Sequence, residues 1–579
     1  MKTIAKALIL SVLILLLFTS AATAQEWVVT SGGDTANRVD LSSVNLSNMT
    51  LREAIAKASS GDTIVFADNV AAVIVTNGTL NISKDLTIGG PSNVSVARNS
   101  SQVTREMTVF TVSGANVTFR QLTIENGSTA NGTGGGVLID RANVTFESCT
   151  IQRNRADTGG GVYVANNSNV KFVSSTLFRN NATTDGSAIF IRSGSVELQN
   201  TVIDGHSGRH NLVRLEQGRL IADRTTIATN TMTVRGSPVS AASGTTVEFR
   251  NSTFSNNTAT ESAGILTRGT LIVENCVFDR GTTSGNGGGI SLMNGSTGTI
   301  KYSIFSNADV AGDGGGIFVD AGATAAIDTC TFLNNIANYG GAFFSRGTVN
   351  ATAVTAINNT AKFFGGAVAL WNGGDLTMTK SVLAANTARS NNTPRETGGG
   401  GMNISNSRAT LSNNVVVGNT DPRNIDFGEQ NATVRSGGNN LIGAYNGSGR
   451  FPIEATDQSG IQAADVFVIN GGLPDVNRAT GYTAGFDRVP VYTVALNSSP
   501  NNPAAIVLGV VTQPPAPGPG DNETNQTPPP PPTDPEYNDH GNWIKYLIYG
   551  IAAIVLLVII AVAAFLLWRY NEKRKYKFG

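Results

Sequence analysis

A glycine-rich phrase that returns about every 26 residues dominates the sequence. Glycines precede a short apolar run, as in GGGVLI at Gly134, GGGIFV at Gly314 and GGAVAL at Gly365. The first apolar residues of the successive phrases, degenerate copies included, are Val137, Val162, Ile189, Val213, Val239, Ile265, Ile290, Ile317, Phe343, Val368 and Met402. They lie 24 to 27 residues apart, apart from a last step of 34. This period predicts stacked repeats instead of independent domains.

A second phrase, apolar-x-x-Asn, keeps the same period. Its apolar residues are Ile151, Leu177, Ile203, Ile227, Phe254, Phe278, Ile304, Phe332, Ala356, Leu383 and Val416. Its asparagines are Asn154, Asn180, Asn230, Asn257, Asn307, Asn335, Asn359, Asn386 and Asn419, and only His206 and Gly281 interrupt the series. Asn tolerates the left-handed backbone of a tight corner, and stacked amides can hydrogen-bond to one another. The series therefore predicts a structural asparagine ladder.

Together the two phrases predict an all-β fold. Each repeat is expected to form one coil of about three short strands, with coils stacked roughly 4.8 Å apart in parallel sheets. Composition agrees, because 65 Gly and only 14% charged residues leave few strong helix formers. The expected architecture is a right-handed parallel β-helix solenoid.

Segments outside the repeat predict the domain organisation. Residues 1–24 are typical of a signal peptide, with an uncleaved anchor as the alternative. An N-terminal cap with a short helix follows over 25–61, and the β-helix is expected over 62–511. Residues 512–542 form a Pro-rich stalk. The apolar segment 543–568 predicts a transmembrane α-helix, with a buried core helix as the alternative, and 569–579 a basic cytosolic tail.

This arrangement predicts a single-pass protein of the plasma membrane with type I topology. The ectodomain is expected outside the cell and the C-terminus in the cytosol, following the positive-inside rule. The chain carries 41 basic and 41 acidic residues, and that balance argues against a nucleic-acid partner. The expected partners are the membrane and a glycan or protein ligand on the outside.

The phrases resemble the extracellular repeats of polymorphic outer-membrane proteins and related adhesin-like surface proteins, within the pectate-lyase-like superfamily. The resemblance rests on GGAFF at Gly340, FSNN at Phe254 and FLNN at Phe332. MTLREAIAKASSGDTIVF, from Met49, resembles the entry segment of such proteins. There Thr50 is expected to N-cap a helix that covers the first coil. The resemblance implies a right-handed β-helix and a surface role.

Some members of this superfamily cleave pectin-like polysaccharides, but their catalytic motifs are missing from this chain. The galacturonan hydrolases carry paired aspartates and a Gly-His-Gly, whereas this chain has no Asp-Asp and only Gly205-His206-Ser207. We therefore expect no catalytic residues, no metal site and no cofactor. The predicted function is adhesion, recognition or surface architecture. The alternative is a membrane-tethered polysaccharide lyase or hydrolase.

One column on the outer face forms a candidate binding surface. The column lies three residues after the first apolar residue of each glycine phrase. In it Glu216 follows Arg192 by one coil, Arg346 follows Asp320 by one coil, and Trp371 comes one coil after Arg346. An exposed indole could stack on a sugar, so Trp371 is a candidate sugar-stacking residue. An ordinary solvated face with weak ion pairs is the alternative.

Sequons supply the remaining candidate sites. The chain has 24 Asn-x-Ser/Thr sequons, and none of the nine ladder asparagines is an acceptor. The N-glycosylation candidates are Asn45, Asn77, Asn116, Asn143, Asn181, Asn251, Asn256, Asn294, Asn358 and Asn431.

The three cysteines occupy one slot of the repeat. Cys149, Cys276 and Cys330 each lie two residues before the apolar column, and therefore point inward. Two coils separate Cys276 from Cys330, which is too far for a disulfide. We expect three free buried thiols.

Overall fold

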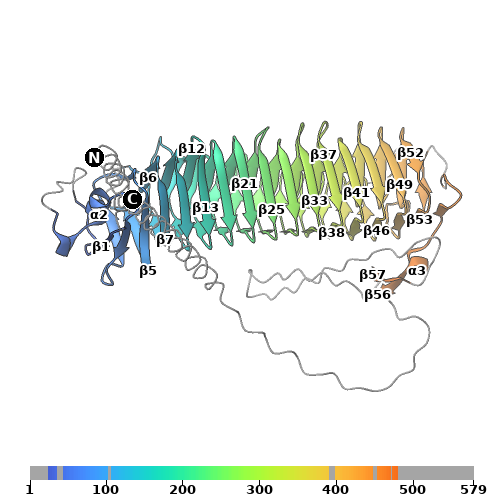
Figure 1. The fold of residues 1–579 in the computed structure, drawn as a ribbon. Helices are drawn as coiled ribbons and strands as arrows, with labels where there is room; N and C mark the ends of the chain where they lie inside the picture. Colours follow the sequence, from blue (N-terminus) through green and yellow to red (C-terminus); the bar gives the residue numbers. More distant parts are fainter. Residues whose placement is uncertain are drawn as a thin grey trace, which may run out of the picture. The chain divides into compact units, whose positions relative to one another are not determined.

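Successive coils of the chain add strands to the same parallel sheets, so the strands run side by side in chain order (Figure 1). The computed structural model describes residues 24–35, 44–101, 106–389, 398–447, 451, 453–470 and 473–479. The predicted signal segment up to residue 23, the Pro-rich stalk, the transmembrane segment and the basic tail lie outside these residues. Among the described residues no helix is long and apolar enough to cross a membrane.

Sheet I contains the strands that follow the glycine phrases. Its 15 strands are β4 (Leu80–Ile82), β6 (Phe110–Ser113), β8 (Val137–Asp140), β12 (Val162–Ala165), β16 (Ile189–Ile191), β20 (Val213–Leu215), β24 (Val239–Ala241), β28 (Ile265–Thr267), β32 (Ile290–Leu292), β36 (Ile317–Val319), β40 (Phe343–Ser345), β44 (Val368–Trp371), β48 (Met402–Ser405), β51 (Phe427–Gln430) and β54 (Tyr445–Asn446).

Sheet II is bent and takes up to two strands from each coil, a long one and a short one. The early and long strands are β1 (Glu26–Val29), β2 (Thr63–Phe66), β3 (Ala72–Val75), β5 (Leu86–Arg98), β7 (Asn116–Glu125), β9 (Asn143–Glu147), β13 (Ser168–Val173), β17 (Gly194–Gln199), β21 (Gly218–Asp223), β25 (Thr246–Arg250), β29 (Thr270–Glu274), β33 (Thr297–Lys301), β37 (Thr324–Asp328), β41 (Thr348–Thr352), β45 (Asp375–Thr379), β49 (Arg408–Ser412) and β52 (Thr433–Ser436). The short strands are β10 (Thr150–Gln152), β14 (Thr176–Phe178), β18 (Val202–Asp204), β22 (Thr226–Ala228), β26 (Thr253–Ser255), β30 (Val277–Asp279), β34 (Ile304–Ser306), β38 (Thr331–Leu333), β42 (Thr355–Ile357), β46 (Val382–Ala384), β50 (Val415–Val417), β53 (Leu441–Ile442) and β55 (Gln458–Ser459).

Sheet III consists of short strands that follow the predicted Asn corner. Its eight strands are β19 (Ser207–Gly208), β23 (Thr231–Met232), β27 (Thr258–Ala259), β31 (Thr282–Thr283), β35 (Asp309–Val310), β39 (Ile336–Ala337), β43 (Thr360–Ala361) and β47 (Thr387–Ala388), and the pair β11 (Arg155–Thr158) and β15 (Asn181–Asp185) precedes them. The parallel β-solenoid predicted from the two phrases is confirmed.

Similar side chains stack inside the coils because neighbouring strands pair position by position along most of the repeat. Phe119, Phe146 and Phe172 are paired neighbours on β7, β9 and β13, and their ring centroids are 5.3 and 4.8 Å apart. All three are fully buried. Removing such a column of rings from water is a large favourable contribution to the folding of these three coils.

Left-handed backbone at the corners lets the chain turn within one or two residues. Glycine provides it before sheet I, for example at Gly134, Gly314 and Gly365, whose φ angles are 68°, 72° and 64°. Between the two strands of sheet II the same conformation falls on other residues. These are Ser148, Ser174, Asn200, Arg224, Asn251, Asn275, Tyr302, Thr329, Ala353, Lys380 and Asn413. Each non-glycine residue there costs roughly 1–2 kcal/mol, which the stacked coils must offset.

One coil departs by one residue from the predicted register. Phe305, not Ile304, pairs with Phe332 and enters the interior column. The prediction that Asn307 belongs to the ladder is therefore wrong. Ala308 occupies that position, with its backbone N–H on Asn335 Oδ1, while Asn307 is exposed with φ of 56°. Two adjacent apolar residues, Ile304 and Phe305, made either register compatible with the phrase.

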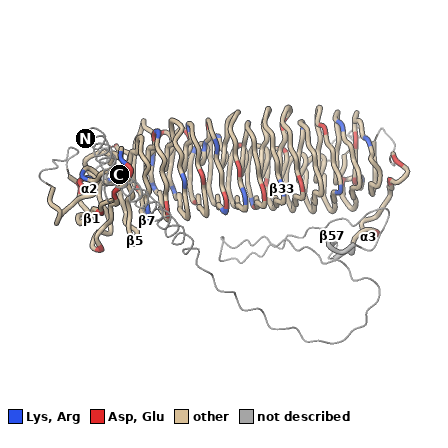
Figure 2. Tube along the Cα trace, viewed as in Figure 1, with Lys and Arg blue, Asp and Glu red and all other residues tan. Residues whose placement is uncertain are grey.

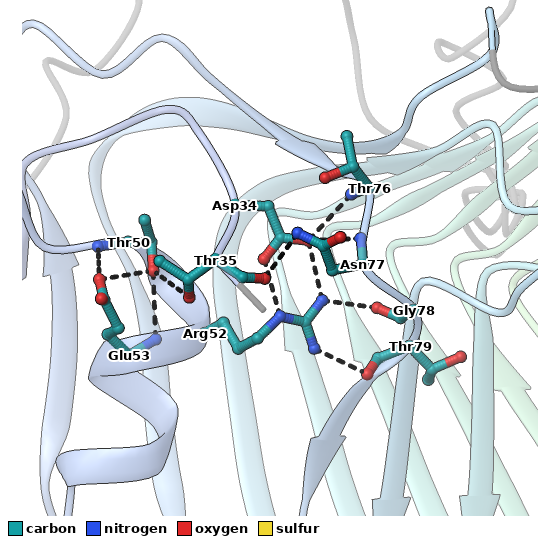
Figure 3. Close-up of polar contacts among 9 residues, drawn as sticks. All are labelled: Asp34, Thr35, Thr50, Arg52, Glu53, Thr76, Asn77, Gly78 and Thr79. Carbon is teal, nitrogen blue, oxygen red and sulfur yellow. Dashed lines mark hydrogen bonds and ion pairs between the residues drawn. The ribbon is translucent and has the colours of Figure 1, made fainter. Parts of the chain in front are cut away.

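A polar cluster fixes the N-terminal end of the stack. Helix α2 (Leu51–Lys57) is N-capped by Thr50, as the sequence predicted, and Thr50 and Glu53 also form a capping box. The 3₁₀ helix η1 (Leu46–Asn48) precedes it. Arg52 forms a buried ion pair with Asp34 at 2.7 Å and also donates to the carbonyls of Gly78 and Thr79 (Figure 3). The cap also contributes β1 to sheet II, so the sheet starts earlier than the predicted boundary at residue 62.

The parallel coils end at β55 within the described residues. Helix α3 (Ala463–Val466) follows, and then an antiparallel hairpin of β56 (Phe467–Asn470) and β57 (Leu473–Ala479). Val466 and Phe467 are buried against Val415, Val417 and Leu441 of the last coils. They cover apolar side chains of these coils.

Candidate ligand-binding surface

An aromatic cluster lies on the outer face of sheet I, over β36, β40 and β44. Phe318 and Phe344, at the outward middle positions of β36 and β40, are buried and stack at 5.7 Å with an interplanar angle of 3°. The next outward position is Ala369, whose small side chain is completely buried. Trp371 packs against this cluster and reaches Tyr339 at 5.6 Å between ring centroids.

Tyr339 is the centre of the cluster. It lies in the loop directly before Gly340 and contacts the rings of Phe344, Phe363 and Phe364 as well as Trp371. Tyr339, Phe363 and Trp371 are half-buried, whereas the rings beneath them are buried. The half-buried rings thus pack on the buried rings below them. We call these three half-exposed residues, with Phe318, Phe344 and Phe364, the aromatic patch.

Charged side chains border the aromatic patch. The Arg346 guanidinium lies over the Phe344 ring at 5.4 Å and is 4.0 Å from the nearer carboxylate oxygen of Asp313. Asp313 lies one coil before Tyr339 in the same loop column, since the N–H of Gly314 donates to the Tyr339 carbonyl. Burial raises the pKa of Asp313 to about 6, and Arg346 opposes that rise. Within the described part of the chain, the Asp313 carboxylate accepts no hydrogen bond.

The described residues contain only one of the two ion pairs expected in the outer column. Arg192 and Glu216 do pair across one coil, at 3.7 Å, on an exposed surface. Arg346 pairs with Asp313 instead of Asp320. Trp371 is half-buried in a ring cluster, so only part of the indole that the sequence singled out can meet a ligand.

Sequence reasoning missed Asp313, Tyr339 and Phe363. They lie in the loop before the glycine phrase, a segment that carries no constant residue. The signal was available, because the residue directly before the first glycine is Asn286, Asp313, Tyr339 and Phe364 in four successive coils. Aligning that position in the same way as the strand positions would have brought the acid and the rings into one column.

The asparagine ladder occupies a buried corner of the coils. Asn335, Asn359, Asn386 and Asn419 form a continuous run in which both the backbone N–H and the side-chain Nδ2 of one residue donate to Oδ1 of the next. Asp426 ends this run by accepting from Asn419. A shorter run joins Asn154 to Asn180, and another joins Asn230 to Asn257.

His206 fills the ladder position between Asn180 and Asn230. Its Nδ1 lies 3.1 Å from Asn230 Oδ1 and its Nε2 3.3 Å from Asn180 Nδ2. These partners require a neutral ring with the proton on Nδ1. Burial lowers the pKa of His206 to about 4, which keeps the ring neutral. The ring is fully enclosed and serves as a ladder member.

The candidate glycosylation sites differ in how their amides are used. Asn45, Asn116, Asn143, Asn251, Asn256, Asn294, Asn358 and Asn431 are exposed, and Asn77 and Asn181 are half-buried. Asn116 and Asn143 form an outer column in which Asn143 donates to Asn116 and Asn116 donates to Asp85. Asn77 donates to the Thr35 carbonyl inside the N-terminal cap (Figure 3).

A family comparison agrees with this geometry. The model of the right handed beta helix region matches residues 42–218 and 187–361, together more than half of the chain. The chain belongs to the right-handed β-helix family. No curated protein matches the sequence.

In this β-helix the cysteine thiols lie in the interior, and the charged residues are spread over the coils. Cys149, Cys276 and Cys330 are free and buried, as the register predicted. Burial raises their pKa values to about 12, so they remain protonated. Among the described residues, no three His, Cys, Asp or Glu side chains gather in a way that could hold a metal ion. Acidic and basic residues are interspersed along the coils (Figure 2).

Proposed function

We propose that this β-helix protein is a non-catalytic, glycosylated surface protein that recognises a glycan or protein ligand. In this proposal one C-terminal transmembrane helix anchors it in the plasma membrane, with the coils outside. The aromatic patch is the observation that carries the proposal. Half-exposed rings on a rigid base are typical of binding surfaces, because they offer contact area at little cost in side-chain entropy.

The surroundings of the patch support a binding role. Other large apolar side chains that are clearly exposed, such as Leu46, Val234 and Tyr302, are scattered over separate elements. Burial raises the pKa of Asp313, at the border of the patch, to about 6. The groups with comparably shifted pKa values in the corner ladder, His206 and Asp426, are both buried there. Their hydrogen bonds hold successive coils together, and such groups are committed to structure.

The test uses the full-length chain with a C-terminal tag, expressed in eukaryotic cells. We expect a membrane-impermeant reagent to label the chain on intact cells, and enzymatic removal of N-glycans to lower its mass. We also expect the expressing cells to adhere to a surface that carries the ligand, and Trp371→Ala to abolish this adhesion. Tyr302→Ala is the matched control, because Tyr302 is 46% exposed and lies outside the aromatic patch. An intracellular chain, or adhesion equal in both variants, contradicts the proposal.

The polysaccharide-active alternative is tested on the same material. Pectin and related polymers are incubated with the purified chain, and the reducing ends or unsaturated products are measured. If the purified chain cleaves one of these polymers, and a substitution in the coils abolishes that cleavage, the protein is an enzyme and the binding role is wrong.

A further inference from the structure

We infer that the aromatic patch, together with Asp313 and Arg346, is a binding site for a neutral pyranose unit of a glycan. This inference rests on the recognition role proposed above and names the ligand class that the site takes. It follows from three properties of the site: the arrangement of the rings, the unused acceptors of Asp313 and the charges at the border.

The arrangement of the rings decides where a ligand can lie. Tyr339 is 5.0 Å from Phe363 and 5.6 Å from Trp371, measured between ring centroids. Rings at that distance are in contact with one another and leave no space for a cation between them. A ligand must therefore lie on the outer faces of the rings. The flat C–H face of a pyranose suits such a platform, since it buries apolar surface while its hydroxyls stay at the edge.

Asp313 provides acceptors at that edge. Its carboxylate lies beside the loop that carries Tyr339, and within the described part of the chain it accepts no hydrogen bond. A half-buried carboxylate with unused lone pairs is stabilised by a ligand that donates hydrogen bonds. Adjacent hydroxyls of a sugar are such donors. The Arg346 guanidinium, 4.0 Å from Asp313, supplies donors for the ring and hydroxyl oxygens.

The charges at the border select a neutral sugar. Asp320 precedes Arg346 by one coil in the column that leads to Trp371, since the Arg346 N–H donates to the Val319 carbonyl next to Asp320. Asp313 and Asp320 thus lie at the border together with two cations, Arg346 and the exposed Lys362 next to Phe363. These charges balance, so the border offers no net positive charge that would attract a uronic acid or a sulfated sugar over a neutral one.

The experiment measures binding of the purified full-length chain in detergent to an array of neutral glucans, mannans, galactans and xylans. Polygalacturonan and sulfated glycosaminoglycans are the acidic comparators. The expected result is binding to at least one neutral glycan class, with weaker or no binding to the acidic polymers. The matching oligosaccharide should change tryptophan fluorescence, and Trp371→Ala should remove that change.

Variants assign the binding to the site. Trp371→Ala is expected to weaken binding at least tenfold, and Asp313→Asn several-fold, while Tyr302→Ala leaves it unchanged. Thermal unfolding of each variant shows whether the coils are intact. If Trp371→Ala unfolds the chain, the more conservative Trp371→Phe, which keeps a ring but shortens the stacking face, is expected to reduce binding without loss of fold.

Several outcomes would overturn the inference. Binding that is equal in wild type, Trp371→Ala and Asp313→Asn places the sugar elsewhere. Preferential binding of acidic polymers contradicts the neutral ligand. Trp371-dependent adhesion that survives enzymatic removal of the target's glycans indicates a protein ligand, so the inference fails while the proposed recognition role stands. Loss of Trp371-dependent adhesion to every target contradicts both.

Discussion

At the scale of single residues, the coils tolerate substitutions that keep the local hydrogen bonds. His206 illustrates this, because a neutral imidazole can accept from Asn180 and donate to Asn230 as an asparagine amide would. Histidine can take the place of asparagine here only while its ring is neutral. A proton on Nε2 would face the Asn180 amide N–H with a second donor and break the ladder at that coil.

His206→Asn should therefore remove a pH-dependent weakness. The folded pKa of His206 is about 4, below the ordinary value of 6.5, so the unfolded chain binds a proton that the folded chain excludes. The free energy of unfolding therefore decreases as pH drops from about 7 towards 4, because protonation of His206 favours the unfolded chain. We expect the variant's advantage in the free energy of unfolding to increase by roughly 1–2 kcal/mol from pH 7 to pH 5. Thermal or denaturant unfolding of both proteins measures it, and a constant difference would contradict the assignment.

Ala353 offers a second residue-scale prediction. It has φ of 53° at the turn between β41 and β42, a conformation that glycine adopts freely. Ala353→Gly is expected to stabilise the protein by up to about 1 kcal/mol. Ala351→Gly is the matched control, because Ala351 is buried inside β41 and the same change there should destabilise. Equal signs for the two variants in denaturant unfolding would show that the turn is not strained.

At the scale of elements, the corner ladder joins neighbouring coils more specifically than the apolar interior does. Asn359 donates from Nδ2 to Asn386 and to the carbonyl of Phe332, and its Oδ1 accepts from Asn335. All of these atoms are buried, so no water can replace a missing partner.

Asn359→Ala is expected to destabilise by roughly 2–5 kcal/mol, because it leaves several buried polar groups without partners. Asn169→Ala, an exposed substitution on β13 that removes no sequon, should change the free energy of unfolding by less than about 0.5 kcal/mol. Denaturant unfolding compares the two variants. Similar changes in the free energy of unfolding for the two variants would mean that the ladder contributes little to stability.

The elements also show how far sequence reasoning reaches. The two phrases predicted the sheets, the inward cysteines and the capping helix, because each depends on residues that recur at one position of the coil. The register at Ile304 and Phe305 could not be decided from that phrase alone. Ser303 did contain the answer, since it holds the slot of Cys276 and Cys330, and its hydroxyl accepts from the Cys276 N–H. The aromatic patch was missed for a different reason: its loop residues differ from coil to coil.

At the scale of the whole molecule, most coils serve as a regular support and a few carry a distinctive surface. Exposed ion pairs across coils, such as Arg120 with Glu147 and Arg192 with Glu216, contribute little to stability. The aromatic patch occupies only the coils from β36 to β44. A repeat architecture allows this division, because each coil depends mainly on its neighbours and a change in one surface loop leaves the others intact.

The most direct test of recognition without turnover is a titration of the full-length protein with a neutral oligosaccharide, followed by mass analysis of the recovered ligand. Binding is monitored by tryptophan fluorescence in wild type and in Trp371→Ala. We expect saturable binding to wild type, at least tenfold weaker binding to the variant, and a ligand recovered at its original mass. A ligand recovered in shortened or unsaturated form, or binding unaffected by the loss of Trp371, would contradict this expectation.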